Sequence, residues 1–158
     1  MESLIDKLNH FTSWQIARFA SDDDYKWRRP YDISRFEGNI FVNTGINLLW
    51  DLATGAGGTT YAAANCYLGT GTSTTAADAT QTDLQTAGVR VIVDSVTTSA
   101  QQFVAVSTFT SAVANQSWQE FGTFNASTAG TMLNRKVSDQ GTKTSGQTWE
   151  LTMTITLA

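Results

Sequence analysis

The stretch WELTMTITL, residues 149–157, decides the fold class because apolar and polar side chains alternate along it without interruption. The odd positions are all apolar, and the even positions are Glu150 and three threonines. Successive side chains of a β-strand point to opposite faces, so this period of two predicts a strand with one buried face. The other face carries small hydroxyl groups, which another protein chain can cover at little desolvation cost.

Further strands are predicted along the chain, and most of them are short. They fall at residues 62–68, 89–96, 103–110, 118–124 and 131–137. Turn sequences rich in glycine, serine and threonine separate them, and the chain contains 25 threonines, which favour strands. Five or six short strands at this spacing predict an antiparallel β-sandwich of jelly-roll type.

Residues 41–55 predict one short helix within this β-rich chain. Asn43 or Thr44 can cap its first turn, and Gly55 is a typical stop signal. Its apolar side chains share one face: Ile46, Leu49, Trp50 and Ala53. A second short helix can begin at Ser3, with its apolar side formed by Leu4, Ile5, Leu8 and Phe11.

Charge and aromatic content divide the chain near residue 38. Residues 1–37 hold six of the 10 Lys and Arg, seven of the 14 Asp and Glu, and seven of the 17 aromatic residues. Because a segment of this length rarely folds alone, we expect two parts: an extended N-terminal arm, residues 1–37, and a β-sandwich body, residues 38–158. Aromatic and arginine side chains are enriched at interfaces. The residues expected to contact a partner are Trp14, Phe19, Tyr25, Trp27, Arg28, Arg29 and Tyr31. The alternative is an arm that folds back on its own body.

Composition argues against several classes of protein. The net charge of −4 disfavours nucleic-acid binding, which usually needs a basic surface. We expect no membrane span, because no stretch approaches the roughly 18 consecutive apolar residues that one needs. The first residues lack the basic start and apolar core of a secretory signal. Cys66 is the single cysteine and is expected to be a small buried side chain.

Candidate catalytic and ligand-binding groups are sparse, so we expect neither an enzyme nor a bound cofactor or metal. His10 is the only histidine, and no serine lies in a nucleophile turn. The acidic run at residues 22–24 lacks the spacing of a calcium loop and is followed by basic residues. The sequence LGTGTST, residues 68–74, lacks the lysine of a phosphate-binding loop. Glu120 and Glu150 carry no sign of the facing carboxylates of a glycosidase.

Three segments together resemble small structural proteins of tailed bacteriophages. These are YLGTGTSTTAADATQTDLQT (67–86), FTSAVANQSWQEFGTFNASTAGTMLNRKV (109–137) and the terminal WELTMTITL. The resemblance covers roughly residues 40–158, and residues 1–37 lie outside it. The positions that carry the shared pattern are Trp118, Glu120, Gly122, Phe124, Leu133 and Arg135. We expect them to determine the fold, with Glu120 and Arg135 as a cross-strand pair.

This resemblance implies a component of the virion, assembled in the cytoplasm of the host bacterium. The first expected role is a capsid decoration (cement) protein that binds the major capsid protein and stabilises the head as a homo-oligomer, for which a trimer suits icosahedral symmetry. A tail, collar or fibre-attachment protein that docks on a tail or neck component is the alternative. A carbohydrate-binding β-sandwich module is a more distant one.

Overall fold

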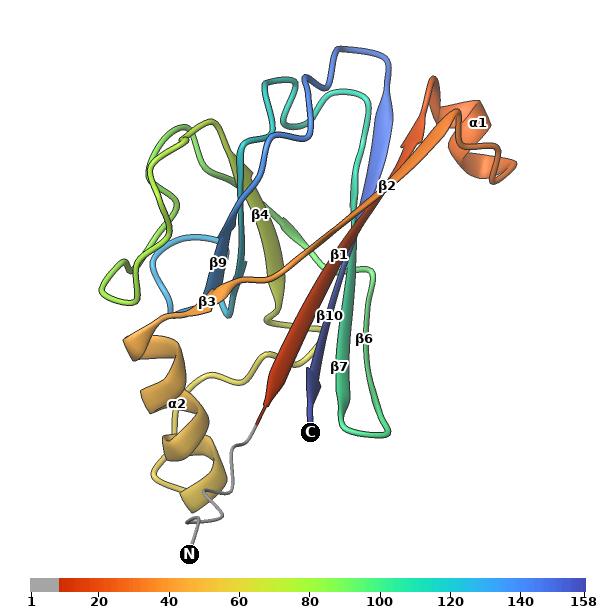
Figure 1. Ribbon diagram of the computed structural model, residues 1–158. Helices are drawn as coiled ribbons and strands as arrows, with labels where there is room; N and C mark the ends of the chain where they lie inside the picture. Colours follow the sequence, from red (N-terminus) through yellow and green to blue (C-terminus); the bar gives the residue numbers. More distant parts are fainter. Residues whose placement is uncertain (1–8) are drawn as a thin grey trace, which may run out of the picture.

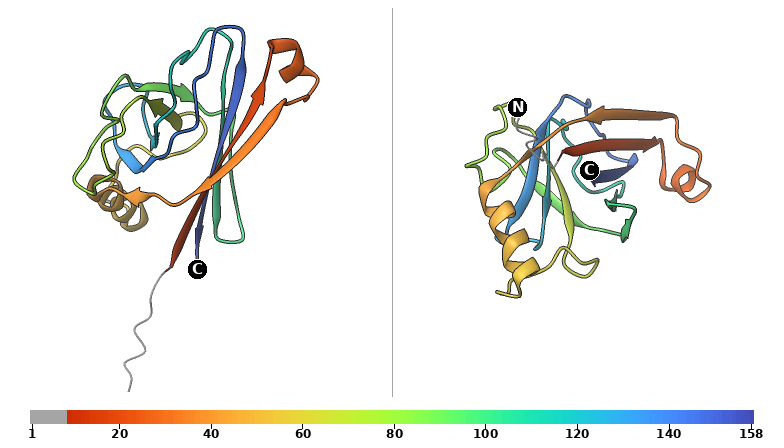
Figure 2. Two further views of the ribbon diagram at one scale, coloured as in Figure 1. Left: turned by 45° about the horizontal axis from the view of Figure 1, so that its top comes forward. Right: turned by 60° about the horizontal axis from the view of Figure 1, so that its bottom comes forward.

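The computed structural model describes residues 9–158 as two antiparallel β-sheets stacked face to face, with two short helices (Figures 1 and 2). Sheet A contains, in spatial order, β2 (Asp32–Glu37), β1 (His10–Phe19), β10 (Thr148–Leu157), β7 (Gln102–Phe109) and β6 (Ser95–Ser99). Sheet B contains β3 (Ile40–Phe41), β9 (Met132–Val137), β8 (Glu120–Phe124), β4 (Tyr67–Gly71) and β5 (Val89–Ile92). The helices are α1 (Asp22–Lys26), between β1 and β2, and α2 (Asn43–Thr54), after β3. The predicted antiparallel β-sandwich is therefore confirmed.

The last strand, β10, lies in the middle of sheet A and has the alternating burial that its sequence predicts. Trp149, Leu151, Met153 and Ile155 are each at most 4% exposed, whereas most residues between them are partly exposed. β10 pairs with β1 on one side and with β7 on the other, so Met153 lies opposite Trp14 of β1. The apolar face of β10 consequently forms the centre of the core between the two sheets.

The largest departure from the expected organisation concerns residues 10–37, which belong to the sandwich. β1 pairs with β10 along its whole length, and β2 extends sheet A beyond β1. Trp14 and Phe19 are 1% and 0% exposed, so they are core residues and not the partner anchors that we expected. Over the part of residues 1–37 that the structure describes, the chain forms no separate arm, and residue 38 marks no break in the fold.

A charged residue, Arg18, lies in a strand of the core because its guanidinium is paired. Arg18 in β1 is only 7% exposed, and its guanidinium donates to Asp32 at 2.6 Å and to Ser34 at 2.8 Å. The same guanidinium lies 4.6 Å from the centre of the Trp149 ring. An arginine paired and stacked in this way is stable beside a hydrophobic core.

Residues 89–96, predicted as one strand, contribute to both sheets. β5 lies at the edge of sheet B, the chain crosses over at Val93 and Asp94, and β6 begins in sheet A. The strand predicted at residues 62–68 begins only at Tyr67, as β4. The other predicted strands correspond to β7, β8, β9 and β10, whereas β1, β2 and β3 were not predicted.

The helix α2 forms where the sequence predicts it. Gly55 ends it in the left-handed conformation, with a φ of 75°, as expected of a glycine stop signal. No side chain hydrogen-bonds to its first turn, so the predicted cap by Asn43 or Thr44 is wrong. The second expected helix, starting at Ser3, lies outside the described residues except at its end, where Phe11 belongs to β1.

The face of α2 that packs on the protein differs from the apolar face of its sequence. Gly45 and Leu48 are buried, and a Cβ atom on Gly45 would lie 2.6 Å from a backbone oxygen of β9. Ile46, Leu49 and Trp50 are instead 39%, 40% and 67% exposed. The close approach that Gly45 permits therefore sets the orientation of the helix and leaves its larger apolar side chains at the surface.

Candidate functional site

The candidate catalytic groups of the sequence are dispersed through the fold. Among residues 9–158, no three His, Cys, Asp or Glu side chains lie close enough together to hold a metal ion. His10 is exposed, and its ring packs edge-on against Phe41 with 4.9 Å between ring centres. Cys66 is fully buried, and this burial raises the pKa of its thiol to about 12, which keeps the thiol protonated.

Glu120 and Arg135 form the cross-strand ion pair that the sequence predicts. Their side chains are fully buried, and the Glu120 carboxylate accepts hydrogen bonds from Nη2 of Arg135 at 2.7 Å and from Nε at 2.9 Å. The carboxylate also accepts from the backbone N–H groups of Ser73, Gln85 and Thr86. The ion pair thereby holds the loop of residues 72–88 against the outer face of sheet B.

The glycines of LGTGTST serve this packing and leave no room for a phosphate group. Gly69 and Gly71 lie in β4 beneath the loop. A Cβ atom on Gly71 would lie 2.5 Å from a carboxylate oxygen of Glu120 and 2.6 Å from the backbone oxygen of Thr86. The expectation that this sequence is no phosphate-binding loop agrees with this geometry, since the space is filled by the protein itself.

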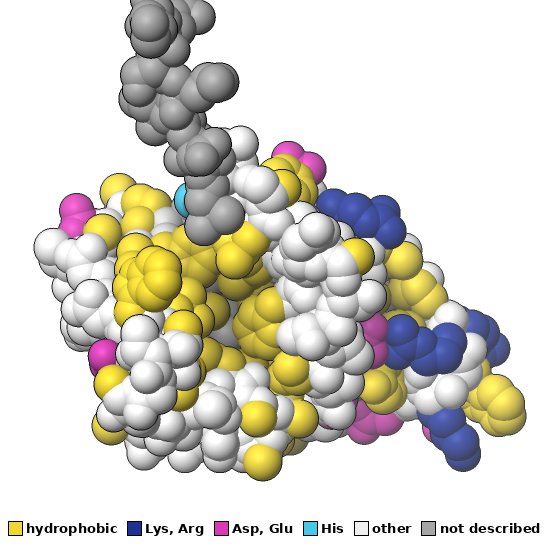
Figure 3. Space-filling view, turned by 90° about the horizontal axis from the view of Figure 1, so that it is seen from below, with side chains coloured by type: hydrophobic (Ala, Val, Ile, Leu, Met, Phe, Trp, Pro, Cys, Tyr) yellow, Lys and Arg dark blue, Asp and Glu magenta, His cyan; other side chains and the backbone are white. Residues whose placement is uncertain are grey.

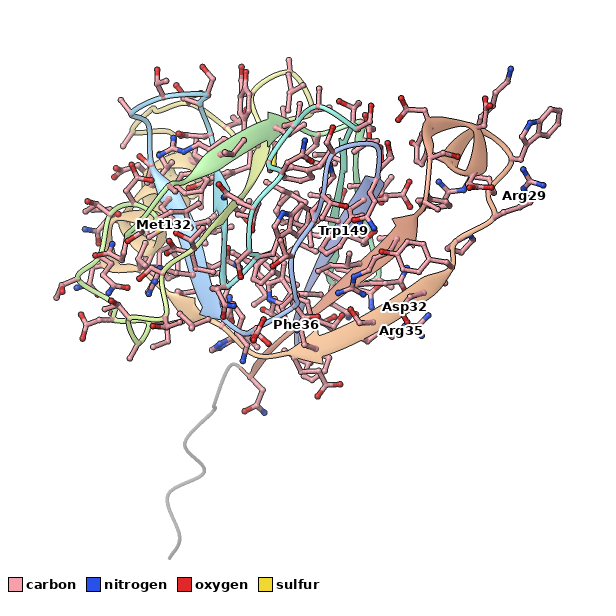
Figure 4. The ribbon with its side chains drawn as sticks, turned by 90° about the horizontal axis from the view of Figure 1, so that it is seen from above. Arg29, Asp32, Arg35, Phe36, Met132 and Trp149 are labelled. Atoms are coloured by element: carbon pink, nitrogen blue, oxygen red, sulfur yellow. The ribbon has the colours of Figure 1, made fainter. Side chains whose placement is uncertain are left out.

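A hairpin between β1 and β2 projects from the sandwich and carries most of the expected partner residues. This segment, residues 21–32, is called the α1 tip below, and Figures 1 and 2 show it extending beyond the two sheets. Ser21 caps α1, because its hydroxyl accepts a hydrogen bond from the Asp24 N–H at 3.1 Å. Figure 4 shows Arg29 at the far end of the tip and Asp32 and Arg35 along β2.

Two of the expected partner residues instead fix the α1 tip to the sandwich. Arg28 makes a two-point ion pair with Glu150, with N···O distances of 2.8 and 2.9 Å, and the hydrogen bond to Glu150 is the main reason that the pKa of Arg28 is raised. Tyr25 packs edge-on against Phe19 and its hydroxyl lies 2.9 Å from that of Thr108. Their side chains therefore hold the tip in place, although that of Arg28 remains 58% exposed.

Asp22 adds a third attachment at the base of the tip. Its carboxylate accepts hydrogen bonds from the hydroxyls of Thr148 and Ser111. These two hydrogen bonds lower the pKa of Asp22, with Thr148 contributing most. Asp22, the first residue of the acidic run, thus anchors the tip within the chain.

The outward surface of the tip includes the remaining expected residues, and β2 adds beside it an exposed apolar residue that was not expected. Trp27 and Tyr31 are 66% and 53% exposed, and the side chain of Arg29 is 66% exposed beside Asp24. Ile33, at the start of β2, is 45% exposed and was missed because its strand was not predicted. An exposed tryptophan on an anchored turn has the character of an interface hot spot, because little conformational entropy is lost when it binds.

A second exposed apolar surface lies at the opposite end of the sandwich, where β1 begins and β10 ends. An open hollow of about 450 Å³ lies there between α2 and the inner face of sheet A. Figure 3 views this end and shows hydrophobic side chains gathered around the hollow. Its apolar lining includes Phe41, Leu49, Tyr61, Phe103, Leu133 and Ile155. No sequence pattern indicates this hollow, because its walls come from segments that lie far apart along the chain.

Comparison with known proteins adds no relative: no protein-family model matches the chain, and no curated protein or solved structure is significantly similar to it. Within residues 9–158, neither helix is long and apolar enough to cross a membrane.

Proposed function

We propose that this chain is a structural protein of a tailed bacteriophage particle, and that it decorates the outer surface of the capsid. The sequence resemblance over residues 40–158 supports a virion component, and the low charge and hydroxyl-rich strands suit a chain that is covered by neighbours. The two-sheet sandwich is compatible with this role. A decoration protein that binds only the mature lattice stabilises it by mass action.

The observation that carries the attachment is the exposed aromatic surface of the anchored α1 tip. Trp27 and Tyr31 are the proposed anchors that enter apolar pockets of the major capsid protein, and Arg29 is the proposed partner of an acidic group on it. Trp14 and Phe19 are excluded from this role by their burial. The proposed interface is therefore smaller than residues 1–37 and consists of one projecting turn.

The attachment is tested by adding the purified chain to particles that lack it and measuring the bound fraction. Trp27→Ala removes the proposed central anchor, so the affinity should fall by about 30-fold, the equivalent of a hot spot of about 2 kcal/mol. Trp50→Ala is the matched control, because Trp50 is 67% exposed but lies on α2, away from the tip. Equal binding of both variants would refute attachment through the tip.

The position of the chain in the particle decides between the first role and its alternative. A copy number comparable to that of the major capsid protein indicates head decoration. A copy number of about a dozen or fewer per particle indicates a tail, collar or fibre-attachment protein. Quantitative gel analysis of purified virions provides this ratio. Absence of the chain from purified particles would refute both virion roles.

Exposed Trp27 and Tyr31 also favour one non-viral candidate, a carbohydrate-binding module, because aromatic faces stack on sugar rings. The full chain should be applied to a glycan array, since the isolated body of residues 38–158 would lack β1 and β2. Glycan binding that Trp27→Ala abolishes would favour this function over decoration.

A further inference from the structure

The apolar hollow at the end of the sandwich has no role in the proposed function and lies far from the α1 tip along β1. It forms at the end of the sandwich where the strands of sheet A extend past those of sheet B (Figure 1), and Ile155 and Leu157 of β10 line it. Leu49 of α2 and Tyr61 form the other wall. The hollow is therefore an incompletely covered part of the core rather than a polar cleft.

The lining of the hollow restricts the chemistry of its occupant. Among residues 9–158, no charged side chain lines it, and its polar groups belong to threonines, glutamines and Tyr61. A charged occupant would lose its hydration without gaining a partner, whereas an aliphatic one would remove apolar surface from water. The hollow thus selects an uncharged, apolar group with the size of a few aliphatic side chains.

The segment that leads into β1 starts at the rim of this hollow. Asn9 exchanges two backbone hydrogen bonds with Ala158, at 2.7 and 2.9 Å, which continues the pairing of β1 with β10. His10 packs against Phe41, and both Phe41 and Leu157 line the hollow. The eight residues that precede Asn9 are therefore tethered beside the opening.

The eight residues MESLIDKL include aliphatic side chains of the kind that the hollow selects. Their larger aliphatic side chains are Leu4, Ile5 and Leu8, and their charged side chains lie between or before them. In β1 the inward positions alternate from Trp14 to Thr12 and His10. Leu8 precedes His10 by the same interval of two residues. Eight residues reach about 12 Å as a helix and up to about 28 Å when extended.

From these relations we infer that the hollow is the docking site for residues 1–8 of the same chain, through the side chains of Leu4, Ile5 and Leu8. The tether favours the same chain over a second copy, because a covalently linked segment has an effective concentration in the millimolar range. The docked segment completes the core at the end that sheet B leaves uncovered. This inference is independent of the proposed virion role.

The test compares two triple variants of the full chain that differ in which side chains of the segment they change. The first replaces Leu4, Ile5 and Leu8 by serine, and the matched control replaces Glu2, Asp6 and Lys7 by serine. An apolar fluorescent dye reports whether the hollow is open, and methyl NMR reports proximity to Leu49 and Ile155. Neither variant changes a residue of the sandwich, so both should fold, and only the first should unfold at a lower urea concentration than the wild type because it loses the docked side chains.

The wild type and the control should bind the dye weakly and show NOEs from the methyl groups of Leu4, Ile5 and Leu8 to those of Leu49 and Ile155, and the first variant should bind the dye several-fold more strongly. Equal dye binding by all three proteins, without these NOEs, would overturn the inference. NOEs found only between differently labelled copies, with self-association in sedimentation, would overturn it in favour of a second copy. An acyl ligand that co-purifies with the wild type and accounts for the filled hollow would overturn it as well.

Discussion

Replacing Glu120 by glutamine should destabilise the sandwich and release the loop of residues 72–88. The glutamine keeps the shape of the side chain but leaves the Arg135 guanidinium buried without a counter-charge, and both side chains are 0% exposed. Removing one partner of such a pair costs about 3–5 kcal/mol. The same carboxylate accepts from the backbone N–H groups of Gln85 and Thr86, so the loop loses charge-assisted hydrogen bonds as well.

Urea unfolding and hydrogen exchange measure the two parts of this prediction separately. The unfolding free energy should fall by about 3–5 kcal/mol, and the melting temperature by roughly 6–20 °C for a chain of this length. The amides of Gln85 and Thr86 should exchange faster than global destabilisation alone explains. Adding Arg135→Met to the variant should cost much less than it does in the wild type, because the uncompensated charge is then gone. A loss below about 1 kcal/mol with unchanged loop exchange would refute the reasoning, since that is the range of exposed pairs.

Three further substitutions test other parts of the structure. Phe19→Ala should cost about 3–5 kcal/mol in urea unfolding because Phe19 is 0% exposed, and an unchanged midpoint would restore it as a surface residue. Met153→Asp places a charge at the centre of the core and should destabilise the fold by several kcal/mol, or prevent folding, as seen by circular dichroism. Burial lowers the pKa of Lys143 to about 8 from its usual 10.5, so the unfolded chain binds more protons between these values. Stability measured by urea unfolding should therefore rise with pH from about 8 to 10.5, and Lys143→Met should reduce that rise.

The strands with regular alternation could be predicted from the sequence, whereas those that carry paired charges could not. The sequence of β10 alternates from Trp149 to Leu157, and burial follows that pattern as far as Ile155, whereas Leu157 at the end of the strand is 40% exposed. β1 also has inward apolar residues, but Arg18 interrupts the pattern and the acidic and basic residues of α1 follow it. Only the contacts of Arg18 with Asp32 and with the Trp149 ring explain why such a strand is stable beside the core.

The candidate interaction surface was predictable only in part, for the same reason. Residue type identified Trp27 and Tyr31, which are exposed, as candidate interface side chains, but it equally identified Trp14 and Phe19, which are buried. An aromatic residue gains from burial in a core and in an interface alike, so composition does not distinguish the two environments. The distinction depends on pairing with β10, which lies more than a hundred residues further along the chain.

Arg28 has two possible roles in attachment, which variants can distinguish: it contacts the proposed partner directly, or it positions the tip. Its side chain is 58% exposed, but both of its ion-pair contacts go to Glu150, whose side chain is 13% exposed beneath it. If Arg28 acts through this pair, Arg28→Lys and Glu150→Gln should weaken attachment to particles by similar factors, because each removes the two-point contact. Hydrogen exchange in residues 21–32 should increase in both variants. Normal attachment by Glu150→Gln, together with a defect in Arg28→Lys, would instead mean that Arg28 contacts the partner directly, and the attachment surface would then extend from Trp27 across to β10.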